Sequence, residues 1–457
     1  MRGGSGLGLT ISYKDNQLIL PEINCCCGVE HQRPDLDVYI GEGILAGIVD
    51  YLGKRKLGKK ALVIADENTY RVAGEETIRL LRAGGFTVTL CLLEREEELE
   101  PDEAALGEIL LALEQGIDFL VAVGSGSIND LTRYVAFHTG RPFVSVATAA
   151  SMDGYTSVVA PLLARGLKVN KPATYPQVLI CDLEIIKNAP YPMVISGFGD
   201  IIGKYIAKAD WILGRIINQE AYCPVAAALI SQAVEKCLQQ LDGIKNRTPE
   251  GIKRMMEALI LSGLTILMLG HTRPVASIEH NMAHYWEMIK LSRGEKAPRH
   301  GTAVGVATLY AARFYALFLA EEWKTLDLER IRQARPAKTV WEKAVLDAYG
   351  EKIGPLILRD NPGEYLDWPE QERRLQALCR DLRLIKEELA FLPGPEKLEE
   401  VFRELGAPTT AAEVGIDKDT LRKSLLYAKD YRERYTVFKT VNEAGKLEEW
   451  VERVLHW

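Results

Sequence analysis

Three of the seven histidines in this chain of 457 residues lie within a window of 21 residues, as His280, His284 and His300. The four-residue spacing places His280 and His284 on one face of a helix, and His300 would begin a separate element. Two imidazoles from two elements, together with a distant carboxylate, can bind a metal ion and leave one position open for a substrate oxygen. Histidines without a joint role, on a surface or in a core, are the alternative.

A candidate for the distant carboxylate is Asp200, in the segment Ser196-Gly-Phe-Gly-Asp-Ile-Ile-Gly-Lys204. We expect this segment to open a helix, with Asp200 in the first turn. An acidic residue there could act only as a helix cap, which stabilises by about 0.5–2 kcal/mol. Beside the histidines, Asp200 is the natural third metal ligand.

The segment from Asp118 to Asp130 (DFLVAVGSGSIND) predicts a buried strand, a glycine turn and the start of a helix. Gly124 and Gly126 let the backbone approach a ligand closely because they carry no Cβ. The first amides of the helix can then bind a pyrophosphate. The Rossmann fingerprint requires a third glycine where this chain has Asn129. The segment therefore indicates a phosphate loop of another type, with a purely structural turn as the alternative.

Two further strand ends carry candidate cofactor contacts. Asp66 follows the expected strand 61–65, where a carboxylate can accept a hydrogen bond from a ribose hydroxyl; it could equally cap a helix that begins near Thr69. The segment 146–157 follows another strand, and its small and hydroxyl side chains suit a cofactor lying across the strand ends. Asp153 is the carboxylate best suited to face a cleft there, unless the segment is a plain loop with Ser and Thr turns.

Strands and helices alternate over the first 185 residues, which predicts a parallel, doubly wound sheet. From about residue 196 onward, apolar residues recur at helical spacing. We therefore predict an α/β dinucleotide-binding domain over 1–185 and a helical domain over 186–457. The expected strands are 38–41, 61–65, 86–92, 119–123, 143–147 and 178–181. The expected helices are 44–52, 69–83, 102–115, 129–139, 201–217, 226–241, 253–269, 278–290, 303–320 and 328–349.

Composition excludes several classes of protein. A net charge of −7 gives no sign of a nucleic-acid partner, and an apolar run long enough to span a membrane does not occur. The first nine residues have no signal-peptide pattern and we expect a frayed end, so the predicted location is the cytoplasm. Cys25-Cys26-Cys27, followed by Gly28 and His31, could bind a metal or sense redox state; a small apolar patch near a strand is the alternative.

The chain resembles the sn-glycerol-1-phosphate dehydrogenase family, in particular its bacterial branch, over roughly residues 35 to 320. The resemblance rests on motifs that occur in this order: GSGSIND (124–130), TAASMDG (148–154), GFGD (197–200), EHNMAH (279–284) and HG (300–301). This family belongs with glycerol dehydrogenase, iron-type alcohol dehydrogenases and 3-dehydroquinate synthase. It implies a Rossmann-like N-terminal domain, an all-helical C-terminal domain and an active site in the cleft between them.

The resemblance also implies roles for individual residues. Asp200, His280 and His300 would bind one divalent metal, which is zinc, nickel or iron in relatives. Asp153 and His284 would contact the substrate and act in catalysis. NAD or NADP would lie against the following residues: Asp66, Gly124, Gly126, Ser127, Ile128, Asn129, Asp130, Thr148, Ala149, Ala150, Ser151 and Ser157. A homodimer and a place in phospholipid metabolism are expected from the family alone.

The implied reaction interconverts sn-glycerol 1-phosphate and dihydroxyacetone phosphate by hydride transfer. A phosphorylated polyol needs a cation at its phosphate, and Lys204, Lys171 and Arg299 are unranked candidates that could each be ordinary surface bases. Three alternatives remain open: a glycerol dehydrogenase, a 3-dehydroquinate synthase-like lyase on the same fold, and a non-catalytic nucleotide-binding protein. The lyase branch usually has a glutamate as its first metal ligand, whereas this chain has Asp200.

Overall fold

The computed structural model describes residues 11–19, 25–31, 34–96, 98–165, 167–323 and 326–457. The expected frayed end, residues 1–9, lies outside this part of the chain. The chain forms two compact units, one comprising 1–201 and 224–272, the other comprising 202–223 and 273–457. The boundary predicted near residue 185 falls just after the last strand of the large sheet, which ends at Asp182.

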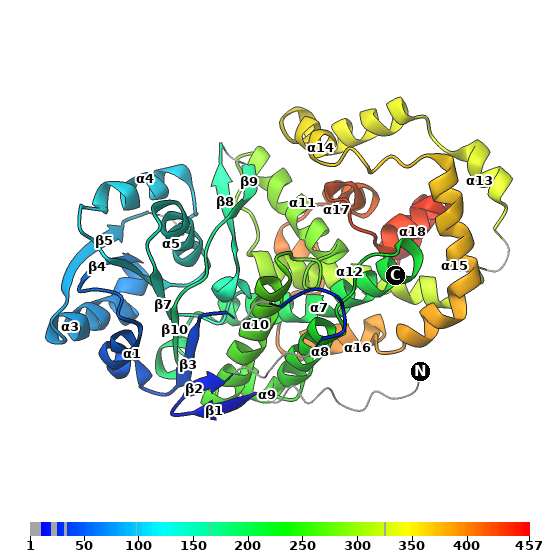
Figure 1. Cartoon of the computed structure of the whole chain (residues 1–457). Helices are drawn as coiled ribbons and strands as arrows, with labels where there is room; N and C mark the ends of the chain where they lie inside the picture. Colours follow the sequence, from blue (N-terminus) through cyan, green and yellow to red (C-terminus); the bar gives the residue numbers. More distant parts are fainter. Residues whose placement is uncertain (1–10, 20–24, 32–33, 97, 166, 324–325) are drawn as a thin grey trace. The chain divides into compact units, whose positions relative to one another are not determined.

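The first unit contains an eight-stranded sheet with the order β1-β2-β3-β10-β7-β6-β4-β5 (Figure 1). The strands from β3 to β5 in this order pair in parallel, whereas β1 and β2 at one edge form antiparallel pairs, β1 with β2 and β2 with β3. The parallel α/β prediction is therefore confirmed. The strands are β1 Ser12–Lys14, β2 Gln17–Ile19, β3 Asp37–Gly41, β4 Lys60–Asp66, β5 Thr87–Leu93, β6 Phe119–Gly124, β7 Phe143–Ala147 and β10 Val178–Asp182.

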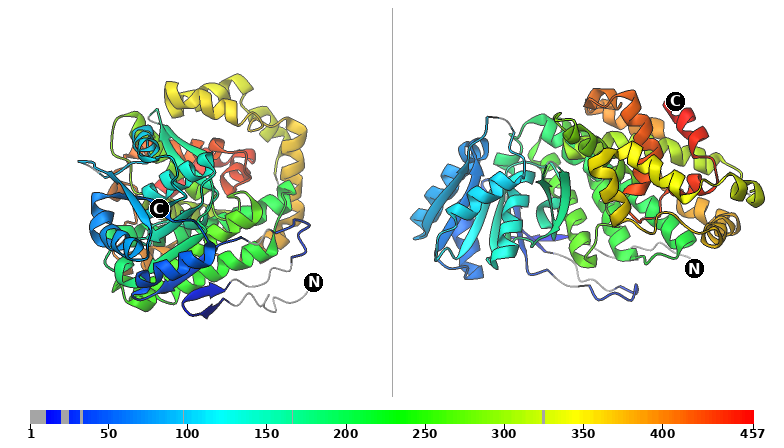
Figure 2. Two further views of the ribbon diagram at one scale, coloured as in Figure 1. Left: turned by 60° about the vertical axis from the view of Figure 1, so that its left-hand side comes forward. Right: turned by 90° about the horizontal axis from the view of Figure 1, so that it is seen from above.

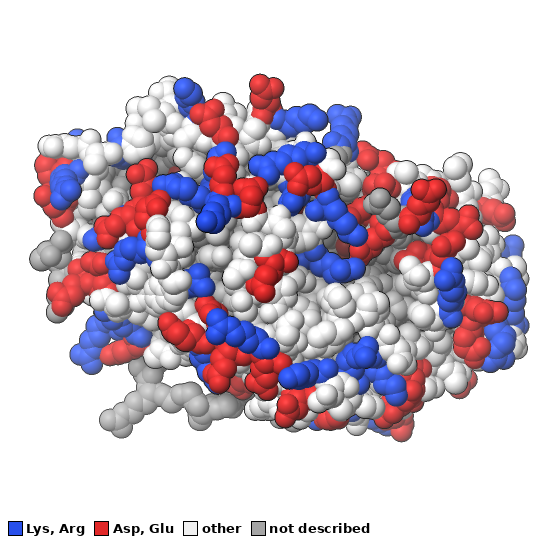
Figure 3. Space-filling view, turned by 180° about the vertical axis from the view of Figure 1, so that it is seen from behind, with Lys and Arg blue, Asp and Glu red and all other residues white. Residues whose placement is uncertain are grey.

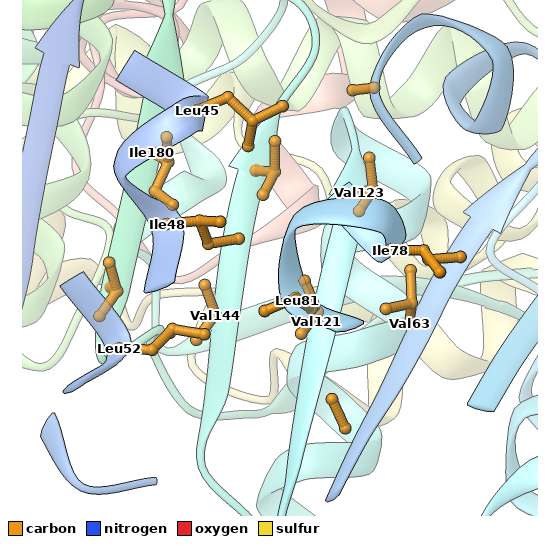
Figure 4. Packing of buried hydrophobic residues seen from close by; sticks show 14 of the residues in the cluster. Leu45, Ile48, Leu52, Val63, Ile78, Leu81, Val121, Val123, Val144 and Ile180 are labelled. Carbon is orange, nitrogen blue, oxygen red and sulfur yellow. The ribbon is translucent and has the colours of Figure 1, made fainter. Parts of the chain in front are cut away.

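Helices cover both faces of this sheet. Successive side chains of a strand point to opposite faces, and β4 follows this rule: Val63 packs with Ile48 and Leu81 in one cluster, whereas its neighbours join a second cluster. Figure 4 shows the first cluster, with α1 and α3 against the strands. The helices around the sheet are α1 Ile48–Arg55, α2 Glu67–Thr69, α3 Glu75–Ala83, α4 Glu103–Ala112, α5 Gly126–Thr139 and α6 Leu183–Ile186.

Two features of this unit differ from the predicted elements. The helix expected over 69–83 is three pieces, α2, a π-helical turn at Tyr70–Gly74 and α3. An antiparallel hairpin of β8 (Val159–Ala164) and β9 (Leu167–Pro172) was not predicted. Its strands lie in a separate two-stranded sheet and lack the long β-branched runs of the large sheet.

The first unit also contains α8 (Pro224–Leu238), α9 (Leu241–Lys245) and α10 (Pro249–Leu269). Helices α8 and α10 lie side by side, as the green helices in Figures 1 and 2 show. The short α9 connects them, so they run antiparallel. Helix α7 (Tyr191–Asn218) begins in the first unit and continues into the second. It begins ten residues before the start expected from sequence.

The second unit is helical, as predicted. Its helices are α11 Ile278–Ser292, α12 His300–Ala320, α13 Leu328–Ala334, α14 Lys338–Asp360, α15 Trp368–Glu388, α16 Pro395–Glu404, α17 Lys418–Tyr427, α18 Val437–Glu443 and α19 Leu447–Leu455. The single helix expected over 328–349 is wrong, because the chain breaks between α13 and α14 at Pro336. Both are yellow in Figure 2.

Among the described residues, α12 is the one helix whose length and apolar composition would allow it to cross a membrane. However, 78% of its most apolar window is buried within the protein. Core helices of helical bundles show the same apolar composition because they pack on all sides. On the face in Figure 3, acidic and basic side chains are interspersed, so no field of one sign covers that surface.

Candidate active site

Three of the predicted cofactor segments meet at one edge of the large sheet. β6 lies between β4 and β7, all parallel, so their carboxyl ends lie together. Asp66 is the last residue of β4, the glycine turn follows β6, and Thr148 follows β7. In open α/β sheets, ligands bind outside the carboxyl ends of the strands. The fold thus places these segments at the edge of the sheet where ligands of open α/β folds bind.

The glycine turn leads directly into α5. Its N-cap residue, Ser125, makes no side-chain cap hydrogen bond; its hydroxyl contacts the hydroxyl of Ser151 instead. A Cβ on Gly126 would meet only the Met152 side chain, at 3.7 Å. The start of α5 is therefore open to a ligand at Gly126 and Ser127, whereas the Ile128 side chain is buried in the core, and helix N-termini favour anions.

Asn129 and its neighbours hold this turn in place. The Asn129 side chain is buried, donates to the Ser125 carbonyl oxygen at 3.2 Å and accepts from the Ser145 hydroxyl at 2.9 Å. It therefore connects the turn to β7. The Tyr155 hydroxyl donates to the Ala149 carbonyl oxygen at 2.7 Å, and this hydrogen bond holds the loop 148–151 in place.

Two buried charges lie one turn apart on α5. Burial raises the pKa of Asp130 to about 6, against the opposing effect of the Arg133 guanidinium, 3.5 Å away. Burial also lowers the pKa of Arg133. Arg133 donates to the carbonyl oxygens of Ser157 and Val159, at 3.3 and 3.4 Å. The hydroxyl of Ser157 also donates to the Val159 carbonyl oxygen, at 3.1 Å. The Asp130–Arg133 pair therefore anchors the start of β8 through the contacts of Arg133.

Asp66 acts as a helix N-cap. Its side chain accepts a hydrogen bond from the Thr69 amide at 2.8 Å, and the Asp66 amide donates to the Thr69 hydroxyl at 3.0 Å. This reciprocal pair is a capping box. The N-cap alternative from sequence is therefore confirmed, and a ribose contact by the same carboxylate stays a prediction.

The carboxylates of Asp153 and Asp200 belong to one hydrogen-bonded group in the first unit. The Asp153 amide donates to Asp200 Oδ2 at 3.1 Å, and Asp153 Oδ2 accepts from the Ser262 hydroxyl at 2.7 Å. Ser262 lies on α10 and was not predicted; sequence gives no signal for it. Asp200 is buried in the third turn of α7, so its expectation as a first-turn or capping residue is wrong.

Gly197 sets how closely α7 approaches the loop 148–151. A Cβ at this position would lie 2.1 Å from the Ala150 carbonyl oxygen and 2.6 Å from Met255 Cε. The backbone oxygen cannot move away without displacing the loop. We expect Gly197→Ala to lower the free energy of unfolding by about 1–3 kcal/mol and to weaken binding of NAD(P), measured by urea denaturation and by cofactor fluorescence.

Gly107→Ala is the matched control for this variant. Gly107 also lies inside a helix, α4, and a Cβ there has nothing within 4 Å. This change should stabilise the protein by about 0.5–1 kcal/mol. Equal denaturation curves and equal cofactor binding for Gly197→Ala and the natural chain would contradict the assigned steric role.

The three histidines lie together in the second unit. His280 and His284 come from α11, and His300 is the first residue of α12. The ring centroids are 5.4 Å apart for His280 and His300, and 5.1 Å apart for His284 and His300. His280 and His284 are buried, and His300 is partly buried. The sequence spacing alone placed the first two on one face; helix packing brings the third to them.

Glutamates orient all three imidazoles. His280 Nδ1 lies 2.7 Å from Glu279 Oε1. Glu287 lies between the other two rings, with Oε2 at 3.0 Å from His284 Nδ1 and Oε1 at 2.8 Å from His300 Nδ1. A carboxylate can only accept from these nitrogens unless it is protonated, so each Nδ1 carries a proton, and in the neutral ring the lone pair is on Nε2. Carboxylate-supported histidines of this kind are typical of metal sites.

Sequence reasoning missed two residues of this cluster. Glu287 is three residues after His284, on the same helical face, so the spacing was a usable signal. Together with His284 and His300, its ligand atoms lie within 4.8 Å of one another. Tyr431 comes from the C-terminal region, where no site residue was predicted, and its ring centroid is 5.4 Å from that of His284.

The three candidate cations for a substrate phosphate differ in burial. Lys171 and Arg299 are exposed, but Lys204 is fully buried in α7. Describing Lys204 as an ordinary surface base is therefore wrong. Its neighbour Gly203 contacts α11 and α12, since a Cβ there would lie 3.3 Å from Glu279 Cγ and 2.8 Å from Val304 Cγ1. Lys204 thus enters the second unit beside the helices that carry the histidines.

Comparison with known proteins now identifies the family. A family model described as iron-containing alcohol dehydrogenase matches residues 39–190. The chain is 33% identical over 426 residues to the "Glycerol-1-phosphate dehydrogenase [NAD(P)+]" of Bacillus licheniformis, covering 93% of each chain. The chain belongs to the glycerol-1-phosphate dehydrogenase family. The protein of the same name from Halalkalibacterium halodurans is 37% identical over 294 residues, 64% of this chain and 73% of that one.

Solved structures agree with this family at the level of the fold. The chain resembles the crystal structure of a 1,3-propanediol oxidoreductase with a TM-score of 0.61 at 17% identity, covering 93% of this chain and 99% of that one. The glycerol-1-phosphate dehydrogenase family was also the resemblance drawn from the motifs, and that prediction is confirmed.

Proposed function

We propose that this protein is a metal-dependent, NAD(P)-linked dehydrogenase that interconverts sn-glycerol 1-phosphate and dihydroxyacetone phosphate. The observation that carries the proposal is the set of carboxylate-oriented imidazoles on α11 and α12, in a chain whose relatives over 93% of its length bear the name glycerol-1-phosphate dehydrogenase. An oriented imidazole set is what a catalytic metal needs. The non-catalytic alternative gives no reason for three such histidines to be retained together.

Asp200, His280 and His300 are the proposed metal ligands. The donor chemistry fits a divalent ion, because two neutral imidazoles and one carboxylate leave further positions open. Asp200 lies one turn before Gly203 on α7, and Gly203 packs against Glu279, the neighbour of His280. This placement on one helix face supports Asp200 as the third ligand. When bound, the metal lowers the pKa of a coordinated hydroxyl and polarises a carbonyl.

The turn at the start of α5 is the proposed site for the pyrophosphate of NAD(P). The open space at Gly126 and the open start of α5 support this assignment. Residues 148–151 would lie along the nicotinamide half, fixed by Tyr155 and by the close contact with Gly197. Asp66 would accept from a ribose hydroxyl with the oxygen that its capping hydrogen bond does not use.

His284 and Asp153 are the proposed catalytic residues. Glu287 holds the proton of His284 on Nδ1, and Nε2 would accept a proton from the substrate hydroxyl or return it in the reverse direction. Ser262 holds the Asp153 carboxylate, which would accept from a second substrate hydroxyl. Hydride transfer itself is the chemistry of the nicotinamide.

Lys204 is the proposed cation for the substrate phosphate. Lys204 is buried on the helix that also carries Asp200, whereas Lys171 and Arg299 are exposed, and a lysine ammonium binds phosphate through charge-assisted hydrogen bonds. The test is steady-state turnover of glycerol 1-phosphate and of glycerol, each with NAD+ and with NADP+. We expect glycerol 1-phosphate to be preferred in the natural chain and Lys204→Met to reduce that preference about 10- to 10²-fold, since charge-assisted contacts are worth about 1.5–3 kcal/mol each. A preference for glycerol in the natural chain would overturn the substrate assignment.

The other functions make different predictions in the same assay. A lyase of the 3-dehydroquinate synthase type recycles its NAD, so no net NADH would accumulate. We also infer a cytoplasmic homodimer acting in phospholipid metabolism, supported by the family assignment. Sedimentation of the purified chain tests the dimer.

A further inference from the structure

The segment Cys25–His31 carries a second cluster of metal-ligating side chains, within the first unit. One ligand atom from each of Cys25, Cys27 and His31 lies within 4.8 Å of the others. Cys27 Sγ is 3.3 Å from His31 Nε2. A thiolate and an imidazole on one tetrahedral zinc ion are separated by about 3.5 Å, given the usual Zn–S and Zn–N bond lengths. The geometry is therefore already that of a metal site.

His31 is oriented for this role by α10. Its Nδ1 lies 3.4 Å from the Met268 carbonyl oxygen. A carbonyl oxygen only accepts, so the proton is on Nδ1 and the lone pair is on Nε2, the atom that faces Cys27. Metal-bound histidines commonly donate their other ring nitrogen to a carbonyl in this way. This contact provides evidence independent of the cysteine spacing.

A turn lies between Cys27 and His31, and Cys26 differs from the two neighbouring cysteines in its exposure. Gly28 has φ of +80°, a conformation that favours glycine, and it turns the chain back from Cys27 toward His31. Cys25 and Cys27 are partly buried, whereas Cys26 is exposed. The middle cysteine is therefore a natural internal control.

A fourth ligand is available at the start of α8. Lys236 on α8 pairs with Glu257 on α10 at 2.8 Å. The two helices are antiparallel and have an equal rise per residue. Counting 12 residues back from Lys236 gives Pro224, and counting 12 residues on from Glu257 gives Leu269. These two residues therefore lie opposite each other. Met268, which holds His31, is at that end of α10. Cys223 is buried and directly precedes Pro224 in the chain, so it lies at this same end of the two helices.

We propose that Cys25, Cys27, His31 and Cys223 bind a structural zinc ion that fastens the N-terminal segment to the α8–α10 hairpin. Three thiolates and one imidazole are a closed, soft ligand set that prefers zinc and leaves no position for substrate. Binding releases the thiol protons to solvent. The site is separate from the proposed catalytic metal, whose ligands include no sulfur, so the two can be distinguished by spectroscopy.

The test uses the full chain produced in cobalt-supplemented medium and purified under reducing conditions. Sulfur-to-cobalt charge-transfer absorption is expected in the natural chain, in His280→Ala and in the matched control Cys26→Ser. Cys27→Ser and Cys223→Ser should lose most of that absorption and one metal equivalent per chain by elemental analysis. The His280→Ala spectrum remains informative even where a cysteine variant does not fold.

The absence of charge-transfer absorption from the natural chain would overturn the proposal. An unchanged spectrum in Cys27→Ser would also overturn it, and an unchanged spectrum in Cys223→Ser would overturn the fourth ligand. Failure of the catalytic proposal has a different signature: His280→Ala would then keep its full metal content and its turnover.

Discussion

Replacing His280 with alanine is expected to remove the catalytic metal and nearly all turnover of glycerol 1-phosphate. His280 is one of two proposed imidazole ligands, and the buried Glu279 carboxylate is 2.7 Å from its Nδ1. The variant loses the ligand and leaves that carboxylate without this partner. Residues that only support a metal ligand are worth about 10–100-fold in metal affinity or activity, so loss of a ligand itself should cost at least 10²-fold in kcat/KM, about 2.7 kcal/mol.

The matched control is His456→Ala. His456 is exposed, and its Nδ1 lies 2.8 Å from the backbone oxygen of Glu452, one turn earlier in the chain. Its removal should leave metal content and kcat/KM unchanged. Turnover of His280→Ala close to that of the control would refute the ligand assignment, whatever its metal content.

Removing the carboxylate of Glu287 should have the second largest effect. The two carboxylate oxygens of Glu287 orient two histidines, with Oε2 at 3.0 Å from His284 Nδ1 and Oε1 at 2.8 Å from His300 Nδ1. In Glu287→Ala both rings can rotate, and each can protonate at Nε2 instead of Nδ1. We expect metal affinity, measured by competition with a chelator, to fall about 10–100-fold, with a parallel loss of kcat.

Two comparisons sharpen this test. Glu295→Ala removes an exposed glutamate that pairs with Lys290 at 2.5 Å and should change nothing beyond about 0.5 kcal/mol of stability. The double variant Glu287→Ala, His284→Ala should lose less than the sum of its single losses, because both act through one contact. Additive losses would mean that Glu287 does not act through His284.

Much of the site could be anticipated because its signals are local in the chain. Buried parallel strands are short apolar runs, so β7 was predicted at its observed bounds and β4 within one residue at each end. The spacing of His280 and His284 on α11 follows from helix geometry alone. Turns were predicted less well: Pro336 divides two helices that the apolar spacing joined.

The pairing of side chains from distant segments could not be anticipated. Ser262 on α10 binds Asp153, 109 residues earlier, and carries no sequence signal of its own. Tyr431 contacts His284 from the C-terminal region, where no site residue was predicted. Such contacts depend on how helices pack, and packing is decided by the complementary shapes of many buried side chains at once.

The sequence by itself determined the family, the parallel sheet and the identity of the chemistry-bearing residues, because strand and helix periodicity and short motifs are properties of neighbouring residues. Only the tertiary structure decided that Glu287 serves two histidines, that Lys204 is buried, and that His31 meets α10 beside two cysteines. Those facts depend on distances between segments far apart along the chain, and no local pattern encodes such distances.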